Sequence, residues 1–179
     1  MSQYFSATSF KNAPFLNVSG TPPISIACWV NFVGVTATQY FLNVNETALR
    51  VATSGIISLY VSGGGASVDV SCATSVTSSI WYHVAGVKAA HNDNKIYLNG
   101  VLEKSDSTLV SSPDFSILNV GSKNDAGANP FNGSLAEVGI WQDTLTQDDI
   151  TALAKGFTPI KIKPNTLKAY YPLIREAGA

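Results

Sequence analysis

Charged side chains are scarce in this chain of 179 residues. Asp, Glu, Lys and Arg make up 13% of it, about half of the roughly 25% found in ordinary soluble domains. The formal net charge is −1, so the chain lacks the basic field that holds a nucleic-acid backbone or an anionic membrane surface. We therefore expect no nucleic-acid partner.

Long apolar runs are also missing. No stretch approaches the roughly 18 apolar residues of a membrane span. The first ten residues, MSQYFSATSF, have neither the basic region nor the apolar region of a signal peptide. We expect neither membrane insertion nor export through a signal peptide.

Cysteine is limited to Cys28 and Cys72, which are far apart and show no metal-binding or redox spacing. Each alternates with apolar residues, so both are expected to point into a core. The spacing leaves two interpretations open, a pair of buried free thiols and a disulfide, because pairing cannot be deduced from sequence.

Small neutral polar residues replace the missing charge: the chain has 20 Ser, 14 Thr and 13 Asn. Such residues favour strands and turns over helices. Apolar and polar residues alternate in runs bounded by turn residues, at 24–33, 39–44, 48–53, 56–61, 68–72, 80–88, 95–98, 101–105, 115–121, 135–141 and 167–173. Asn99-Gly100 supplies the two positive-φ residues of a type I′ hairpin turn. The pattern predicts an all-β sandwich forming a single domain over residues 1–179.

One short amphipathic helix is expected near residues 146–156. Thr146 can cap its start, with Asp149 three residues later, and Gly156 can end it. The spacing places four apolar residues on one face of this helix, which should cover a sheet: Ile150, Leu153, Ala154 and Phe157.

An ordered set of motifs runs through most of the chain. It comprises Ser25-Ile26-Ala27-Cys28-Trp29-Val30, Trp81-Tyr82-His83-Val84-Ala85, Ile96-Tyr97-Leu98-Asn99-Gly100, Val120-Gly121, and Phe131-Asn132-Gly133-Ser134-Leu135-Ala136-Glu137-Val138-Gly139-Ile140-Trp141. In order and spacing these motifs resemble the laminin G/pentraxin branch of the concanavalin A-like lectin/glucanase superfamily. The resemblance implies a two-sheet antiparallel jelly-roll sandwich. In agreement with it, alternation predicts that Ala136, Val138 and Ile140 face the core. Most members bind glycans, proteins or lipids, and a minority hydrolyse polysaccharides.

Catalysis is not expected. Glucanases of this fold carry their acid/base pair on one strand as Glu-x-Asp-x-x-Glu, whereas here Glu137 is followed by Gly139 and Gln142. A lone Glu137 fits a hydrogen-bonded structural carboxylate better than a catalyst, because the mechanism needs two carboxyl groups. His83 falls in an apolar stripe with Trp81, Ala85 and Val87, where a packed histidine with its hydrogen bonds satisfied is favoured. We predict that the chain is not an enzyme.

Calcium is suggested by the resemblance alone, since pentraxin-like relatives hold the ion with oxygen ligands on one sheet face. The matching positions are Asn45, Glu46, Asn124 and Asp125. Lys123, however, stands where the family has an acidic ligand, and an ammonium group would repel the ion. We expect a solvated polar turn here and no required cofactor, with a weaker calcium site as the alternative.

Sugar binding needs exposed aromatic rings beside amide side chains, because a pyranose stacks on a ring while its hydroxyls form hydrogen bonds. One loop has this composition and a second segment is its candidate neighbour. The predicted glycan-binding residues are Tyr40, Asn43, Asn124, Asp125, Asn129, Phe131 and Asn132.

The sequence supports two hypotheses about function. In the first, the chain is a non-catalytic structural or adhesion protein on the surface of a phage particle, as a capsid decoration or a tail or fibre appendage. Its partners would be other virion proteins or further copies of itself in a homo-oligomer, and a cell-surface glycan. Release by lysis would reconcile an extracellular type of fold with a missing export signal. In the second, it is a soluble carbohydrate-binding lectin, with or without assistance from calcium.

Overall fold

The computed structural model describes residues 3–5, 11–18, 22–111, 115–124 and 126–173. Its elements, in chain order, are β1 (Gln3–Phe5), β2 (Lys11–Val18), β3 (Ile24–Phe32), β4 (Gln39–Val44), β5 (Thr47–Val51), β6 (Ile56–Gly63), β7 (Ala66–Ser75), β8 (Trp81–Ala90), β9 (Asp93–Leu98), β10 (Val101–Asp106), β11 (Phe115–Val120), β12 (Gly133–Trp141), α1 (Gln147–Ala154), the 3₁₀ turn η1 (Pro159–Lys161) and β13 (Leu167–Tyr171). Among the described residues no helix is long and apolar enough to cross a membrane.

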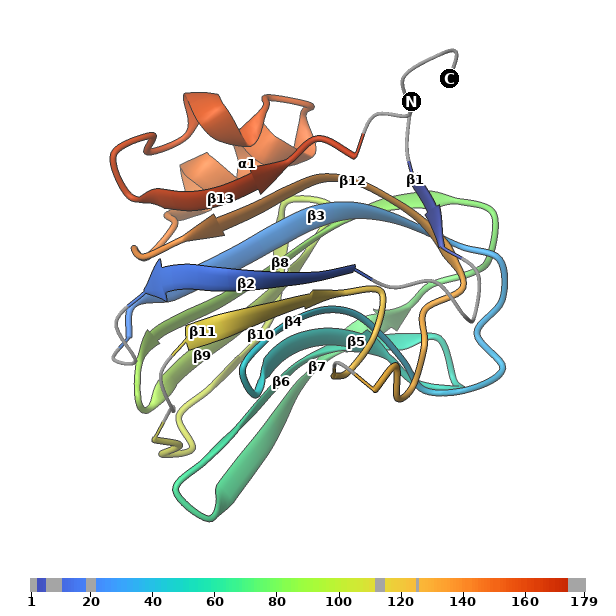
Figure 1. The fold of residues 1–179 in the computed structure, drawn as a ribbon, viewed down its shortest axis with the longest axis horizontal. Helices are drawn as coiled ribbons and strands as arrows, with labels where there is room; N and C mark the ends of the chain where they lie inside the picture. Colours follow the sequence, from blue (N-terminus) through green and yellow to red (C-terminus); the bar gives the residue numbers. More distant parts are fainter. Residues whose placement is uncertain (1–2, 6–10, 19–21, 112–114, 125, 174–179) are drawn as a thin grey trace.

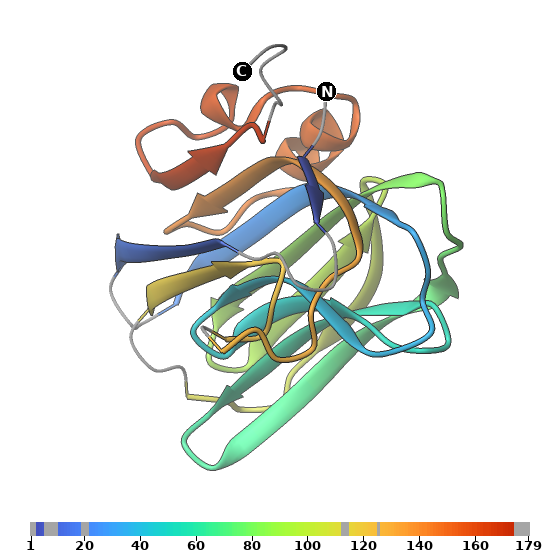
Figure 2. The ribbon, with the colours of Figure 1, turned by 45° about the vertical axis from the view of Figure 1, so that its right-hand side comes forward.

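The strands form two antiparallel sheets stacked face to face (Figures 1 and 2). Within the described residues, a seven-stranded sheet has the order β1-β12-β3-β8-β9-β10, with β13 also paired to β12. A six-stranded sheet has the order β2-β11-β4-β5-β6-β7. The predicted all-β antiparallel sandwich with one helix is confirmed.

The main hydrophobic core lies between the two sheets, because alternate residues of each strand point inward. It contains both cysteines, Cys28 and Cys72, as buried free thiols. Burial is the main cause that raises the pKa of both, to about 12 for Cys72, where the nearby Glu103 carboxylate adds to the effect. Of the two interpretations left open by the sequence, the structure has the unpaired thiols. At these pKa values they are protonated and unreactive at neutral pH.

Asn99 and Gly100 make the tight turn between β9 and β10, with φ angles of 50° and 84°. The hairpin predicted at this dipeptide is therefore confirmed. The backbone of β8 braces it, because the Asn99 backbone N–H donates to the His83 carbonyl at 2.8 Å and the His83 N–H donates to Asn99 Oδ1 at 2.9 Å.

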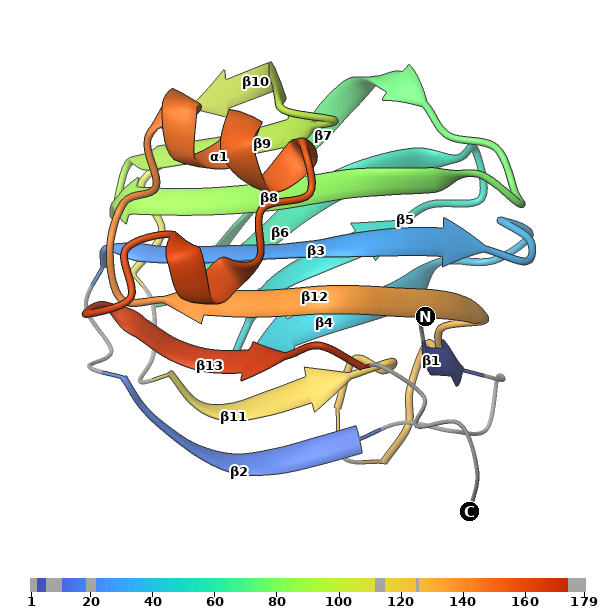
Figure 3. The ribbon, with the colours of Figure 1, turned by 90° about the horizontal axis from the view of Figure 1, so that it is seen from above.

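Helix α1 lies against the outer face of the seven-stranded sheet, over one half of it (Figure 3). Ile150 and Leu153 pack there in a second apolar cluster with sheet residues that include Val87 and Trp141. Thr146 caps the helix as predicted: it accepts a hydrogen bond from the Asp149 N–H, and the Asp149 side chain accepts one from the Thr146 N–H. The predicted contribution of Phe157 to the buried face is wrong. The helix ends at Ala154, and the Phe157 side chain is 56% exposed.

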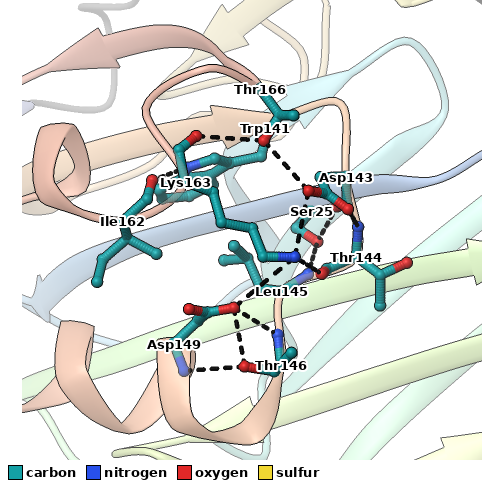
Figure 4. A network of polar contacts seen from close by, with 10 residues as sticks. All are labelled: Ser25, Trp141, Asp143, Thr144, Leu145, Thr146, Asp149, Ile162, Lys163 and Thr166. Atoms are coloured by element: carbon teal, nitrogen blue, oxygen red, sulfur yellow. Dashed lines mark hydrogen bonds and ion pairs between the residues drawn. The ribbon is translucent and has the colours of Figure 1, made fainter.

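A polar network joins the segment before α1 to strand β3 and to the segment after η1 (Figure 4). The Ser25 hydroxyl is buried, donates to the Asp143 carbonyl at 2.6 Å and accepts from the Leu145 N–H at 3.0 Å. Lys163 reaches the Asp143 carboxylate at 3.1 Å and the Thr144 carbonyl at 2.7 Å. These bonds hold α1 on the sheet at its first turn.

Strands β7 and β10 end their respective sheets and lie next to each other at one margin of the sandwich. Glu103 of β10 bridges them. Its carboxylate accepts hydrogen bonds from the backbone N–H groups of Ala73 and Thr74, at 2.9 and 3.0 Å, and from the Thr74 hydroxyl at 3.0 Å. The two outermost strands are thus fastened together by one side chain.

Two expectations about strand faces are corrected. Trp81 is not part of a buried stripe: His83, Ala85 and Val87 are buried, but Trp81 is 38% exposed because it begins β8, away from the half of the sheet that α1 covers. In β12, strict alternation would have pointed Ala136 into the core. A bulge at Glu137, where φ is 52°, shifts the register, so Ala136 is only partly buried.

Candidate functional site

The outer face of the six-stranded sheet is polar at its centre. In β4 and β11 the inward residues, such as Val44 and Leu118, belong to the core, so the residues between them must point outward. Asn43 and Asn119 occupy such outward positions and lie directly opposite each other across the two strands. Two amide side chains are thereby brought together from distant parts of the chain.

A groove of about 470 Å³ opens above this pair. Its walls come from the β4–β5 turn on one side and from the loop that follows β11 on the other. The described residues lining it are Asn43, Asn45, Glu46, Ile117, Asn119, Lys123, Asn124 and Ala126.

The floor of the groove holds two buried hydrogen-bond acceptors with no donor. Asn43 and Asn119 are 7% and 5% exposed, and the Oδ1 atom of each lacks a hydrogen-bond partner. The Asn43 Nδ2 group donates to the Lys123 carbonyl, which sets the orientation of that amide. A buried polar atom left unpaired costs about 1–3 kcal/mol, so each of these amides has an acceptor whose hydrogen bonding is unsatisfied.

The loop after β11 is held by its own hydrogen bonds. The Lys123 N–H donates to the Ala128 carbonyl at 2.8 Å, the Ala128 N–H donates to Asn124 Oδ1 at 3.1 Å, and the Ser122 hydroxyl donates to the Asn124 carbonyl at 2.9 Å. The Lys123 ammonium group lies 5.8 Å from the centre of the Tyr40 ring. This contact places a positive charge beside the groove.

The opposite wall is a tight turn at Asn45 and Glu46, whose φ angles are 34° and 62°. Asn45 Oδ1 accepts a hydrogen bond from the Ile117 N–H at 2.9 Å, which fastens the turn to β11. Glu46 is exposed and lines the groove.

Next to the groove, Arg50 lies 5.5 and 4.6 Å from the ring centres of Tyr40 and Tyr60. The Arg50 guanidinium also donates to Tyr40 Oη at 2.8 Å and pairs with the Asp69 carboxylate. These contacts raise the pKa of Arg50 despite its partial burial. They also cover Tyr40, which is only 3% exposed.

Comparison with known proteins places this chain in a family. The model of the concanavalin A-like lectin/glucanase superfamily, in its laminin G form, matches residues 4–151. The chain belongs to this superfamily. Among curated proteins no sequence matches it.

Solved structures with the laminin G type of fold include three informative neighbours. One is a heptameric SAP-like pentraxin from Limulus polyphemus, with 17% identity, a TM-score of 0.66, and coverage of 84% of this chain and 80% of that one. Another is the CBM40 domain of Ruminococcus gnavus IT-sialidase bound to α2,3 sialyllactose, with 17% identity, a TM-score of 0.68, and coverage of 86% and 96%. The third is domain 4 of the extracellular arabinanase AbnA from Geobacillus stearothermophilus in complex with arabinotriose, with 22% identity, a TM-score of 0.68, and coverage of 86% and 76%. Carbohydrate-binding modules are thus among the structural neighbours of this superfamily member, and at these identities the likeness establishes the fold alone.

The predicted glycan-binding residues of this laminin G type domain do not form one site. Asn43 and Asn124 line the groove, whereas Asn129 and Asn132 line a separate depression of about 430 Å³ beside Gln39. Asp125 lies outside the described residues.

The two aromatic residues predicted for sugar stacking are buried in this superfamily member. The exposure expected for Tyr40 is wrong because Arg50 and Lys123 lie against its ring. The exposure expected for Phe131 is also wrong: its side chain is 0% exposed and packs between Phe32 and Phe41, with ring centres 5.7 and 6.0 Å away. Asn119 was missed, although its place between Leu118 and Val120 marks it as an outward polar residue.

Three of the four positions that the resemblance suggested for calcium in this chain lie together in the structure. Asn45, Glu46 and Asn124 all line the groove, and Asp125 lies outside the described residues. Calcium takes six to eight oxygen ligands and binds most tightly where several are carboxylates. The described part of the groove has a single carboxylate, Glu46, and an ammonium group, Lys123, and no cluster of three acidic, His or Cys side chains occurs among the described residues. The described donors alone fall short of the ligand set that calcium prefers, and the absence of a required calcium ion stays a prediction from the sequence.

Glu137 and His83, the two residues considered for catalysis, lie in the seven-stranded sheet, away from the groove. The Tyr170 hydroxyl donates to the Glu137 carboxylate at 2.8 Å, as a structural carboxylate requires. His83 is packed as expected, but its Nδ1 atom lacks a hydrogen-bond partner, so the expectation of satisfied hydrogen bonds is wrong for that atom. Burial lowers the pKa of His83 to about 4, so the ring is neutral at pH 7.

Proposed function

We propose that this chain is a non-catalytic glycan-binding domain and that the groove on the outer face of its six-stranded sheet holds the sugar. The observation that carries the proposal is the pair of buried, donor-free oxygens of Asn43 and Asn119 at the groove floor. Sugar hydroxyl groups are hydrogen-bond donors, and two neighbouring hydroxyls on one ring would satisfy both oxygens at once.

The surroundings of these oxygens support a sugar as the donor. Ile117 supplies an apolar contact on the groove wall, and sugar sites combine such contacts with a few fixed polar groups. The structures of the CBM40 domain with sialyllactose and of the AbnA domain with arabinotriose add that related folds bind oligosaccharides.

The proposal is tested with a glycan array followed by titration calorimetry on the best ligand. Asn119→Ala removes one acceptor and should weaken binding about tenfold, which corresponds to about 1.4 kcal/mol. Asn129→Ala is the matched control, because Asn129 lines the other depression. Both variants are first compared with the wild type by thermal melting.

Binding that survives Asn119→Ala unchanged would reject the groove. If Asn129→Ala alone removed binding, the site would be the second depression. If the array retained no glycan, the proposed function itself would fail.

A position on the surface of a phage particle stays a prediction from the sequence. The low charge favours it, because a subunit with few charges loses little hydration energy when it packs against neighbouring copies or other virion proteins. Mass spectrometry of purified particles should find the chain at a fixed stoichiometry. Its absence from particles, together with sugar-specific retention on a glycan array, would favour a soluble lectin instead.

A further inference from the structure

Two residues of opposite charge line the groove. Lys123 provides a positive charge and Glu46 a negative one, and both residues line the cavity. They make no ion pair with each other, since the described ion pairs join Arg50 to Asp69, Lys95 to Asp93, and Lys163 to Asp143 and Asp149. A ligand can therefore meet the two charges separately.

Lys123 stands out among these cations. Arg50, on the strand next to β4, is neutralised by its ion pair with Asp69. The Lys123 ammonium has no carboxylate partner within the described residues and lies over the Tyr40 ring. Its backbone is anchored on both sides, by the Asn43 side chain and by Ala128. Within the described residues, Lys123 is thus a cation without a carboxylate partner, and its backbone is fixed at the groove that Asn43 and Asn119 also line.

We propose that the groove binds a sugar residue carrying a single acidic group, a carboxylate or a sulfate ester, without any divalent cation. The acidic group pairs with the Lys123 ammonium, and hydroxyls of the same residue donate to Asn43 Oδ1 and Asn119 Oδ1. The inference rests on the proposed glycan-binding function and adds to it the chemical class of the ligand.

Glu46 limits how much negative charge the groove accepts. Its carboxylate lines the same cavity and would repel a second acidic group placed on its side. The groove should therefore prefer a singly acidic sugar over a densely sulfated chain such as a heparin fragment.

The metal-free character follows from the donor set. An ammonium group in place of an acidic ligand repels Ca²⁺ but attracts the anion that a bound Ca²⁺ would otherwise attract. The Lys123 ammonium therefore attracts the acidic group as a bound cation would, and it needs none of the six to eight oxygen ligands that calcium requires.

The experiment uses a printed array of matched oligosaccharides, each present in a neutral and an acidic form, such as lactose, 3′-sialyllactose and 6-sulfated lactose, with a heparin hexasaccharide added. Binding is measured in chelator and in calcium, and dissociation constants of the best pair are determined by calorimetry. The acidic form should bind about tenfold more tightly than its neutral match, equally in both buffers, and more weakly as salt is raised.

Lys123→Met keeps the length of the side chain and should reduce binding of the acidic form to the level of the neutral one. Lys161→Met, at an exposed lysine outside the groove, should change neither. Equal binding of both forms by the wild type, or an acidic preference that survives Lys123→Met, would overturn the inference while leaving glycan binding intact. Binding that disappears in chelator, or a calcium-dependent rise in melting temperature, would overturn the metal-free claim. An array that retains nothing would reject the proposed function as well.

Discussion

Lys88 allows a quantitative test of the packing, because a primary amine is completely buried between the two sheets. The residue is 0% exposed, and its ammonium donates to the Val110 carbonyl at 2.8 Å and to the His91 carbonyl at 3.5 Å. Burial lowers its pKa from 10.5 to about 8. The charged form is thereby disfavoured in the folded state by about 3 kcal/mol, at 1.36 kcal/mol for each pKa unit.

The sign of the pH dependence follows from proton binding. Between pH 8 and pH 10 the unfolded chain keeps the Lys88 proton while the folded chain has lost most of it, so the free energy of unfolding should rise with pH. The two pKa values predict a rise of about 2 kcal/mol over that interval. Lys88→Met removes the titration and the desolvation cost but also loses the hydrogen bond to Val110 and the longer one to His91, so it should be about 1–2 kcal/mol more stable than the wild type at pH 7.

Chemical denaturation of both proteins at several pH values from 7 to 10 measures this difference directly. The stability advantage of the variant should shrink as the pH rises, and taking the difference cancels the titration of tyrosines common to both proteins. Lys155→Met, at an exposed lysine, is the control and should show no such trend. A difference between Lys88→Met and the wild type that stays constant from pH 7 to 10 would refute the assignment of a perturbed, buried amine.

Three further substitutions test other parts of the fold by denaturant melts at neutral pH. Ser25→Ala leaves the Leu145 N–H without its acceptor and should cost about 1–3 kcal/mol, whereas Ser105→Ala on the exposed margin should cost little; equal losses would contradict the role of the network. Gly86→Ala would bring a Cβ within 2.7 Å of Leu59 Cδ1, so overpacking should cost about 1–3 kcal/mol, and an unchanged midpoint would show that the core relaxes there. Thr146→Ala removes the helix cap and should cost about 1 kcal/mol, a loss that Thr146→Ser should largely restore if the cap is the cause.

Local patterns were sufficient for the strands, the Asn99-Gly100 turn and the helix cap, because each depends on residues adjacent in the chain. Alternation even places Asn43 and Asn119 on outward faces. It does not show that β4 and β11 are neighbours, since that pairing depends on how distant strands assemble. Periodicity could therefore not predict that Asn43 and Asn119 lie side by side at the groove.

The burial of two aromatic residues, Phe131 and Trp81, also could not be predicted from the local sequence. Phe131 stands among polar loop residues, so composition favours exposure, yet the loop carries its ring to Phe32 and Phe41 in the core. Trp81 falls in an apolar alternation, so the pattern favours burial, yet α1 covers only the other half of that sheet face. Both outcomes are decided by which element packs over the residue, and the sequence near each residue does not contain that information.

The bridge at Glu103 has a consequence for solubility. An outermost strand normally presents unpaired N–H groups on which another chain can build a further strand, the first step of ordered aggregation. By engaging the N–H groups of Ala73 and Thr74, Glu103 removes two donors from that template and places a negative charge there instead. In a chain with so few charges, this carboxylate helps to keep copies of the domain from joining edge to edge.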